Sequence, residues 1–185
     1  MGLKILHSAD WHLDSPFAGF DDSQRALLKQ EQQSIPGKIS QLCRREKCDL
    51  MLLAGDIFDG EPARETVEAL KKALSECGAR VFIASGNHDF CAPGSVWQEE
   101  NWPENVYVFT GGLEAVTIPN LNCRVYGAGY QSMDSAPLLE NFRAEGSEKY
   151  CIAVLHGDPT RKDSPYCPIT AQQVRDSGLQ YLALG

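Results

Sequence analysis

Five short apolar runs constrain the fold of this chain more than any other feature of its sequence. None of them shows the alternation of polar and apolar residues that marks a strand with one exposed face. Continuous runs of this length are typical of strands buried on both faces of a parallel sheet. The runs occupy residues 5–6, 50–54, 81–84, 152–155 and 181–184.

Helical signals separate several of these runs. After Pro62, apolar residues recur at spacings of three and four until Gly78, which predicts a helix. Residues 24–46 are helical in composition, and Pro36-Gly37 within them predicts a kink or a pair of helices. The alternation of strand and helix predicts the α/β class.

The middle and the end of the chain carry different signals. Residues 106–130 contain short β-type runs separated by Gly-Gly and Pro-Asn, which predicts hairpins. Residues 131–149 are expected to form a polar loop with a short helix, and residues 171–176 another short helix. No repeat or linker divides the chain, so we expect one domain over residues 1–185.

Charge and composition exclude several classes of protein. The net charge is −8, from 17 basic and 25 acidic residues, whereas a surface that grips nucleic acid by charge alone is usually basic. A polyanionic substrate would therefore need a local patch, a partner or bound metal. No apolar run approaches the roughly 20 residues that span a bilayer, and the N-terminus lacks the apolar core of a signal peptide. We expect a cytoplasmic protein with no membrane partner.

The cysteines support an intracellular location. There are seven of them, an odd number, and no Cys-x-x-Cys pair occurs. Neither a disulfide framework nor a structural zinc site is expected. The cysteines are interpreted as small buried side chains in a reducing compartment.

Residues that can bind metal follow four of the five runs. In an open α/β sheet, the loops beyond the carboxyl ends of the strands form the ligand site. Each motif alone is compatible with a capped turn or a structural histidine, as we expect for His7, but their joint occurrence favours one site. The residues are Asp10 and His12, then Asp56 and Asp59, then Asn87, His88 and Asp89, and finally His156.

The chemistry of this set points to metal. Carboxylate, imidazole and amide oxygen together suit Mn²⁺, Fe²⁺ or Zn²⁺. A carboxylate such as Asp56 has two oxygens and can bridge two ions, as in two-metal hydrolases that act on phosphoryl groups. A nearby histidine that does not bind metal can protonate the departing oxygen.

In order and spacing, these motifs resemble the calcineurin-like metallophosphoesterases. They are similar to the DNA-repair exonuclease branch, which includes the bacterial SbcD-type proteins. Where the protein-phosphatase branch carries Asp-Arg-Gly, this chain has Asp59-Gly60-Glu61. The resemblance implies a two-sheet sandwich flanked by helices, in four layers α-β-β-α. The motifs that carry it are Asp10-x-His12, Gly55-Asp56-x-x-Asp59, Gly86-Asn87-His88-Asp89 and His156.

The resemblance also implies a role for each residue. Asp10 and His12 are expected to bind a first metal ion, Asn87 and His156 a second, and Asp56 to bridge the two. The expected metal is Mn²⁺, with Fe²⁺, Zn²⁺ and Mg²⁺ as alternatives.

Three further roles follow from the same resemblance. His88 is expected to be the general acid or to stabilise the transition state. Asp89 is expected to orient the His88 imidazole, and Asp59 to support the site without binding metal.

One element of the family pattern is missing. The family has a final Gly-His-x-His motif that binds metal, whereas this sequence stops at Gly185. We therefore expect residues 1–185 to be a C-terminally truncated nuclease core. Each metal site would then lack one ligand, which predicts partial occupancy and an inactive fragment.

The leading hypothesis is a metal-dependent phosphodiester hydrolase, a DNA exonuclease acting in DNA repair. Its expected partners are DNA and a coiled-coil ATPase subunit. One alternative is a small-molecule phosphoesterase that acts on nucleotides or cyclic nucleotides. A second alternative is a non-catalytic module of the same fold.

Overall fold

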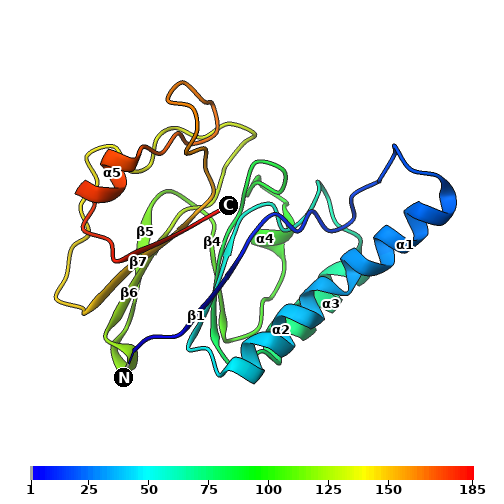
Figure 1. Cartoon of the computed structure of the whole chain (residues 1–185), viewed down its shortest axis with the longest axis horizontal. Coiled ribbons are helices and arrows are strands. Elements are labelled where there is room, and N and C mark those ends of the chain that lie inside the picture. The colour runs from blue at the N-terminus through cyan, green and yellow to red at the C-terminus, as the bar shows by residue number, and fades with distance from the viewer. Residues whose placement is uncertain (1) are drawn as a thin grey trace.

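Two four-stranded sheets stack face to face in the computed structural model, which describes residues 2–185 (Figure 1). All strands of the first sheet are parallel, in the order β1-β2-β3-β4. In the second sheet, ordered β5-β6-β7-β8, only the β5–β6 pair is antiparallel. The first sheet contains β1 (Ile5–Ser8), β2 (Leu50–Ala54), β3 (Arg80–Ala84) and β4 (Val106–Phe109). The second contains β5 (Glu114–Ile118), β6 (Cys123–Gly127), β7 (Tyr150–Leu155) and β8 (Tyr181–Leu184).

Helices cover the outer faces of the two sheets. In Figure 1, α2 and α3 lie beside the first sheet and α5 beside the second, so the expected sandwich of four layers α-β-β-α is confirmed. No helix among residues 2–185 is long and apolar enough to cross a membrane. The helices are α1 (Asp22–Gln33), α2 (Ile35–Glu46), α3 (Arg64–Ser75), α4 (Val96–Glu99) and α5 (Ala171–Asp176), with a 3₁₀ turn at Pro119–Leu121.

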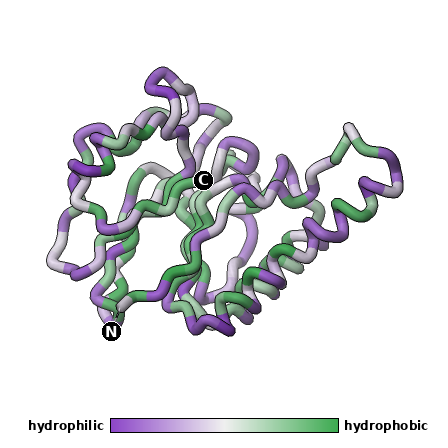
Figure 2. Tube along the Cα trace, viewed as in Figure 1, coloured by the Kyte–Doolittle hydropathy of each residue, from purple (hydrophilic) through white to green (hydrophobic). Residues whose placement is uncertain are grey.

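The strand β2 shows why the apolar runs are continuous. Successive side chains of a strand point to opposite faces. Met51 and Leu53 therefore pack toward the helices, while Leu50 and Leu52 pack against the second sheet. All four side chains are fully buried, and each such burial stabilises the fold by about 1.5–3 kcal/mol. In Figure 2 the central strands are accordingly the most hydrophobic part of the trace.

A third apolar cluster completes the layers. Tyr126, Cys151, Ala153 and Leu155 lie on the outer face of the second sheet, where Val174 of α5 packs against them. Three apolar interfaces thus hold four layers together. Because β2, β3 and β7 are buried along nearly their whole length, their carboxyl ends have well-defined positions.

Several details differ from the sequence-based expectations. Strand β4 pairs in parallel with β3 and is not part of a hairpin, whereas β5 and β6 do form one. Residues 131–149, all described, contain no helix. The break between α1 and α2 falls at Ser34, with Pro36 in the first turn of α2. The helix expected after Pro62 begins at Arg64.

Candidate metal centre

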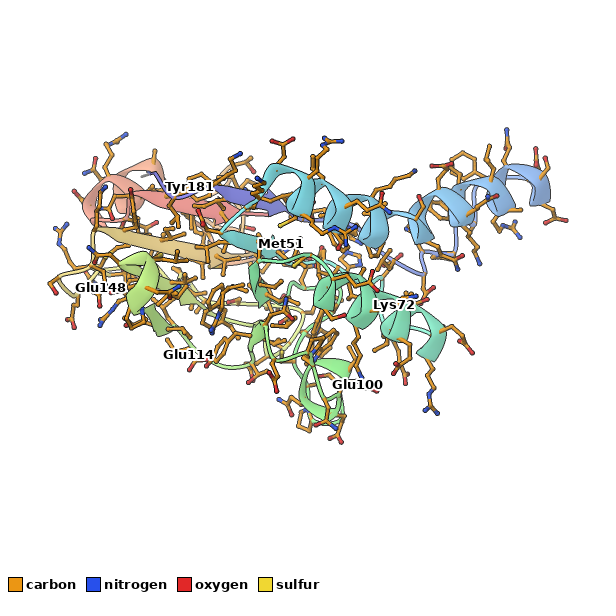
Figure 3. All side chains as sticks on the ribbon, turned by 90° about the horizontal axis from the view of Figure 1, so that it is seen from below. Met51, Lys72, Glu100, Glu114, Glu148 and Tyr181 are labelled. Carbon is orange, nitrogen blue, oxygen red and sulfur yellow. The ribbon has the colours of Figure 1, made fainter. Side chains whose placement is uncertain are left out.

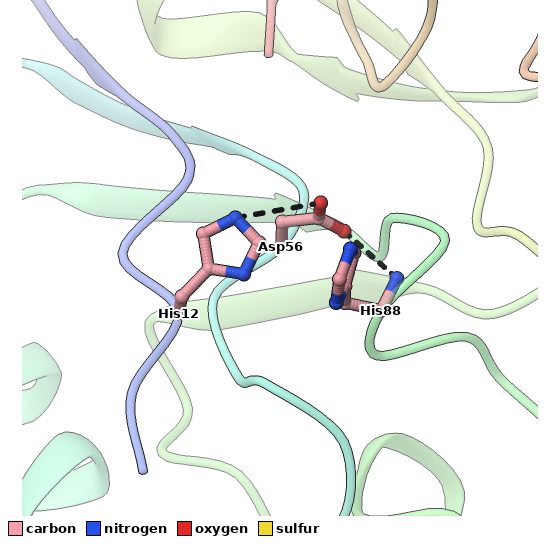
Figure 4. A group of neighbouring side chains, drawn as sticks. All are labelled: His12, Asp56 and His88. Atoms are coloured by element: carbon pink, nitrogen blue, oxygen red, sulfur yellow. Dashed lines mark hydrogen bonds and ion pairs between the residues drawn. The ribbon is translucent and has the colours of Figure 1, made fainter. Parts of the chain in front are cut away.

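The ends of β1, β2, β3 and β7 bring the candidate metal ligands to one edge of the molecule. Two groups, each of three residues with ligand atoms within 4.8 Å of one another, share Asp56. One group is completed by His12 and His88, shown in Figure 4, and the other by Asp10 and His156. Segments more than 140 residues apart in the chain thus meet around a single carboxylate.

Three of these residues have a left-handed backbone, which L-amino acids disfavour. The φ angles of Asp10, His12 and Asp56 are +55°, +46° and +51°. The Asp10 amide donates to the Gly55 carbonyl at 3.0 Å, and the His12 amide to the Asp56 carbonyl at 3.0 Å. Backbone strain of this kind persists only when the surroundings impose it, and it is frequent at functional sites. Here paired backbone hydrogen bonds impose it.

Two glycines let other groups approach closely. A Cβ atom on Gly86 would lie 2.1 Å from Asp56 Oδ1, and one on Gly55 would lie 2.5 Å from the His156 ring. Gly55 also has a φ angle of +92°, which only glycine adopts readily. The space that a side chain would fill at both positions is occupied by ligand groups of the site.

Asp56 is the centre of the cluster and is only 4% exposed. Its Oδ2 lies 3.7 Å from His12 Nε2 and 3.5 Å from His156 Nε2. Its Oδ1 accepts a hydrogen bond of 3.0 Å from the His88 backbone amide, one of the contacts drawn in Figure 4. One carboxylate oxygen is therefore held in place, and the other faces two imidazoles.

The surroundings of His156 show that the residues fit a cation. Its Nδ1 lies 3.1 Å from the Ala54 carbonyl, which can only accept, so Nδ1 carries the hydrogen. Its Nε2 lies 3.0 Å from Asn87 Oδ1 and 3.5 Å from Asp56 Oδ2. One ring nitrogen and two side-chain oxygens thus converge on the same point. Imidazole nitrogen, amide oxygen and carboxylate oxygen together suit a divalent metal ion.

Asn87 has the orientation that such a site requires. Its Nδ2 points toward Met133 Sδ at 3.8 Å, which leaves Oδ1 for His156. Met133 belongs to the loop after β6, and nothing in the sequence indicated that it lies beside Asn87.

His88 differs from the other histidines because its side chain is 44% exposed. Its ring meets that of His12 edge to face, with centroids 4.8 Å apart, and its Nδ1 lies 2.9 Å from Asp59 Oδ1. Burial raises the pKa of Asp59, but hydrogen bonds from Ser15 and His88 outweigh it, so the net pKa lies below its usual value. Asp59 is thus a charged partner for the His88 imidazole.

Asp89 does not make the contact expected from the sequence. Its carboxylate accepts hydrogen bonds from the backbone amides of Gly86 at 2.6 Å, Ile57 at 2.8 Å and Phe58 at 3.2 Å. Burial, followed by repulsion from Asp56, raises the pKa of Asp89 to about 6 despite these bonds. The orienting contact expected of Asp89 is made by Asp59, because the Asp89 side chain points inward and ties the β2 and β3 loops together.

A two-sheet sandwich that gathers carboxylate and imidazole ligands at one edge defines a class, the metallophosphoesterases. The chain matches the calcineurin-like phosphoesterase family over residues 3–184 and belongs to it. This is a family of phosphoester hydrolases that use divalent metals.

Three individual proteins of known sequence are similar to this chain over part or nearly all of its length. The uncharacterized metallophosphoesterase YhaO of Bacillus subtilis is 34% identical over 99% of this chain and 48% of its own length. The SbcD component of the nuclease SbcCD from Staphylococcus epidermidis is 32% identical over 54% of this chain and 27% of its own length. The corresponding SbcD component from B. subtilis is 34% identical over 47% of this chain and 22% of its own length. The chain spans about half the length of the first relative and less of the others.

Proposed function

We propose that the protein is a metal-dependent phosphodiester hydrolase, a DNA exonuclease acting in DNA repair. The observation that carries the proposal is the pair of three-residue groups that share Asp56, one of which includes the exposed His88. The partial similarity to the SbcD components of SbcCD, which is named as a nuclease, supports DNA as the substrate. A coiled-coil ATPase subunit is proposed as the partner and the cytoplasm as the location.

Five residues are proposed to hold two divalent ions, with Mn²⁺ as the natural metal. As the family resemblance implies, Asp10 and His12 would bind one, Asn87 and His156 the other, and Asp56 would bridge them. Asn87 Oδ1 and His156 Nε2 lie 3.0 Å apart, whereas the structure groups the ligand atoms of Asp10 with His156 and those of His12 with His88 around Asp56. When bound, two such ions neutralise phosphoryl oxygens and lower the pKa of the attacking water.

His88 is proposed to protonate the leaving oxygen as the phosphorus–oxygen bond breaks. With Nδ1–H directed at Asp59, 2.9 Å away, its Nε2 is free to carry that proton. Asp59 would hold the ring in that orientation. The exposure of His88 lets a substrate reach it.

The competing activity is hydrolysis of a small phosphoester. The net charge of −8 favours it, because a duplex is repelled by an acidic surface more strongly than a nucleotide is. A non-catalytic role fits less well, since the His88 ring is held by Asp59 and is nevertheless exposed to a substrate at the edge of the cluster.

The test uses the protein with everything that its gene encodes on either side of residues 1–185. With Mn²⁺ added, end-labelled duplex DNA should be shortened faster than bis-p-nitrophenyl phosphate is cleaved. His88→Gln should lower kcat about 10²- to 10⁴-fold while metal content by mass spectrometry stays unchanged. His7→Gln, which alters a histidine in β1 that contacts Tyr181, is the matched control.

Each outcome decides between the candidates. Turnover of the small ester alone would transfer the assignment to the competing activity. Bound metal without turnover of either substrate would overturn hydrolysis altogether. Full activity of His88→Gln would remove His88 from the mechanism.

A further inference from the structure

Gln32 is a polar residue in an unusual place. In α1, all of which the structure describes, it is the one buried residue, at 8% exposed. The rest of the helix lies on the surface, and Figures 1 and 3 show α1 extending away from the two sheets. The buried end of this helix lies against the segment that follows β1.

The side chain of Gln32 contacts the backbone beside a proposed metal ligand. Its Nε2 donates to the carbonyl of Trp11 at 3.3 Å and to the carbonyl of His12. The Gln32 Nε2 atom thus binds the carbonyl that precedes the His12 amide and also the carbonyl of His12 itself. The His12 carbonyl also accepts from the Ser15 amide at 3.1 Å, which closes the turn.

These contacts matter because His12 has a disfavoured backbone. Its φ angle of +46° costs roughly 1–2 kcal/mol relative to the usual region. On one side, the His12 amide is held by the Asp56 carbonyl. On the other side, Gln32 holds the carbonyls. The imidazole can face Asp56, 3.7 Å away, only while this backbone conformation persists.

We infer that Gln32 is a positioning residue of the metal centre. It acts through the Trp11–His12 backbone and touches neither metal nor substrate. This inference rests on the proposed function in one respect, namely that His12 binds metal. Outer partners of metal ligands typically change metal affinity 10- to 100-fold when they are removed.

The test removes the donor and keeps the size of the side chain. Gln32→Met retains the length without N–H groups, and Gln32→Glu retains the shape with acceptors only. Gln33→Met changes the exposed neighbour and is the matched control. For both Gln32 variants, Mn²⁺ affinity measured by electron paramagnetic resonance should fall about 10-fold. The control should bind Mn²⁺ as the unchanged protein does.

A second measurement needs no metal. Hydrogen exchange at the amides of His12 and Ser15 should be faster in both Gln32 variants, because the turn opens more often. If the unchanged protein binds no Mn²⁺, the proposed function fails, and exchange alone decides the role of Gln32. Exchange and affinity equal to those of Gln33→Met would overturn the inference, whatever the variants do to stability in urea.

Discussion

At the scale of single residues, the site depends on two glycines, because a larger residue would fill space that the site needs. Gly55 and Gly86 leave the space that His156 and Asp56 occupy. Gly94 offers a comparison, since its φ angle of +84° resembles the +92° of Gly55 while nothing lies within 4 Å of its missing Cβ. Backbone strain and ligand displacement can therefore be separated experimentally.

Gly55→Ala should abolish tight metal binding, whereas Gly94→Ala should not. The new Cβ at position 55 must displace the His156 ring, which breaks its contact with the Ala54 carbonyl. Both variants carry the left-handed backbone cost of roughly 1–2 kcal/mol in the free energy of unfolding. Mn²⁺ titration and urea unfolding of the two variants measure the two effects. Equal Mn²⁺ affinities would show that Gly55 serves only the backbone.

At the scale of elements, α3 is capped from a distant segment. The residue at its own N-cap, Ala63, has no capping side chain. Instead, Asp14 accepts hydrogen bonds of 2.8 Å from the Ala63 amide and from Thr66 Oγ1. Asp14 belongs to the loop that carries His12, so its hydrogen bonds link the position of α3 to that of the loop.

Asp14→Ala should lower the free energy of unfolding by about 1 kcal/mol, because the cap is lost. Position 14 has a φ angle of +68° before and after the substitution, so the backbone cost largely cancels. Asp21→Ala is the control, because Asp21 caps α1 through a 2.9 Å bond from the Gln24 amide. Since α1 extends away from the two sheets, loss of the Asp21 cap should fray that helix and have a smaller effect on global unfolding. Equal losses in urea unfolding would contradict the special role of Asp14.

At the scale of the whole molecule, the four layers enclose every thiol. All seven cysteines lie within residues 2–185, and each is buried and free of disulfide bonds. Burial raises the pKa of Cys123 to about 12, and burial with neighbouring thiols raises that of Cys43 to about 12. The thiolate, which is the reactive form, is therefore scarce at neutral pH.

Native protein should react slowly with Ellman's reagent at pH 8. The rate should follow unfolding of the chain, and all seven thiols should react in denaturant. A reductant should leave the thermal midpoint unchanged, since there is no bond for it to break. Rapid labelling of one or more thiols in the native protein would show that a layer opens without global unfolding.

The sequence by itself determined the class of fold. A continuous apolar run such as residues 50–54 indicates a strand that is buried on both faces, because a polar side chain there would lose its water without gaining a hydrogen-bond partner. The residue types at the strand ends, among them Asp10, Asp56 and His156, also specify a chemistry before any contact is known. Both properties are local, so they can be read from a single sequence without comparing it with others.

Only the tertiary structure decided which groups meet. That the partner of His88 is Asp59 and not the adjacent Asp89 depends on the direction in which each side chain leaves its loop. The same holds for Gln32 beneath His12, and for β4, whose apolar residues do not reveal whether their neighbour is β3 or β5. Periodicity records how deeply a residue is buried, but contacts across long stretches of chain arise from how the layers pack, and that packing is a property of the whole molecule.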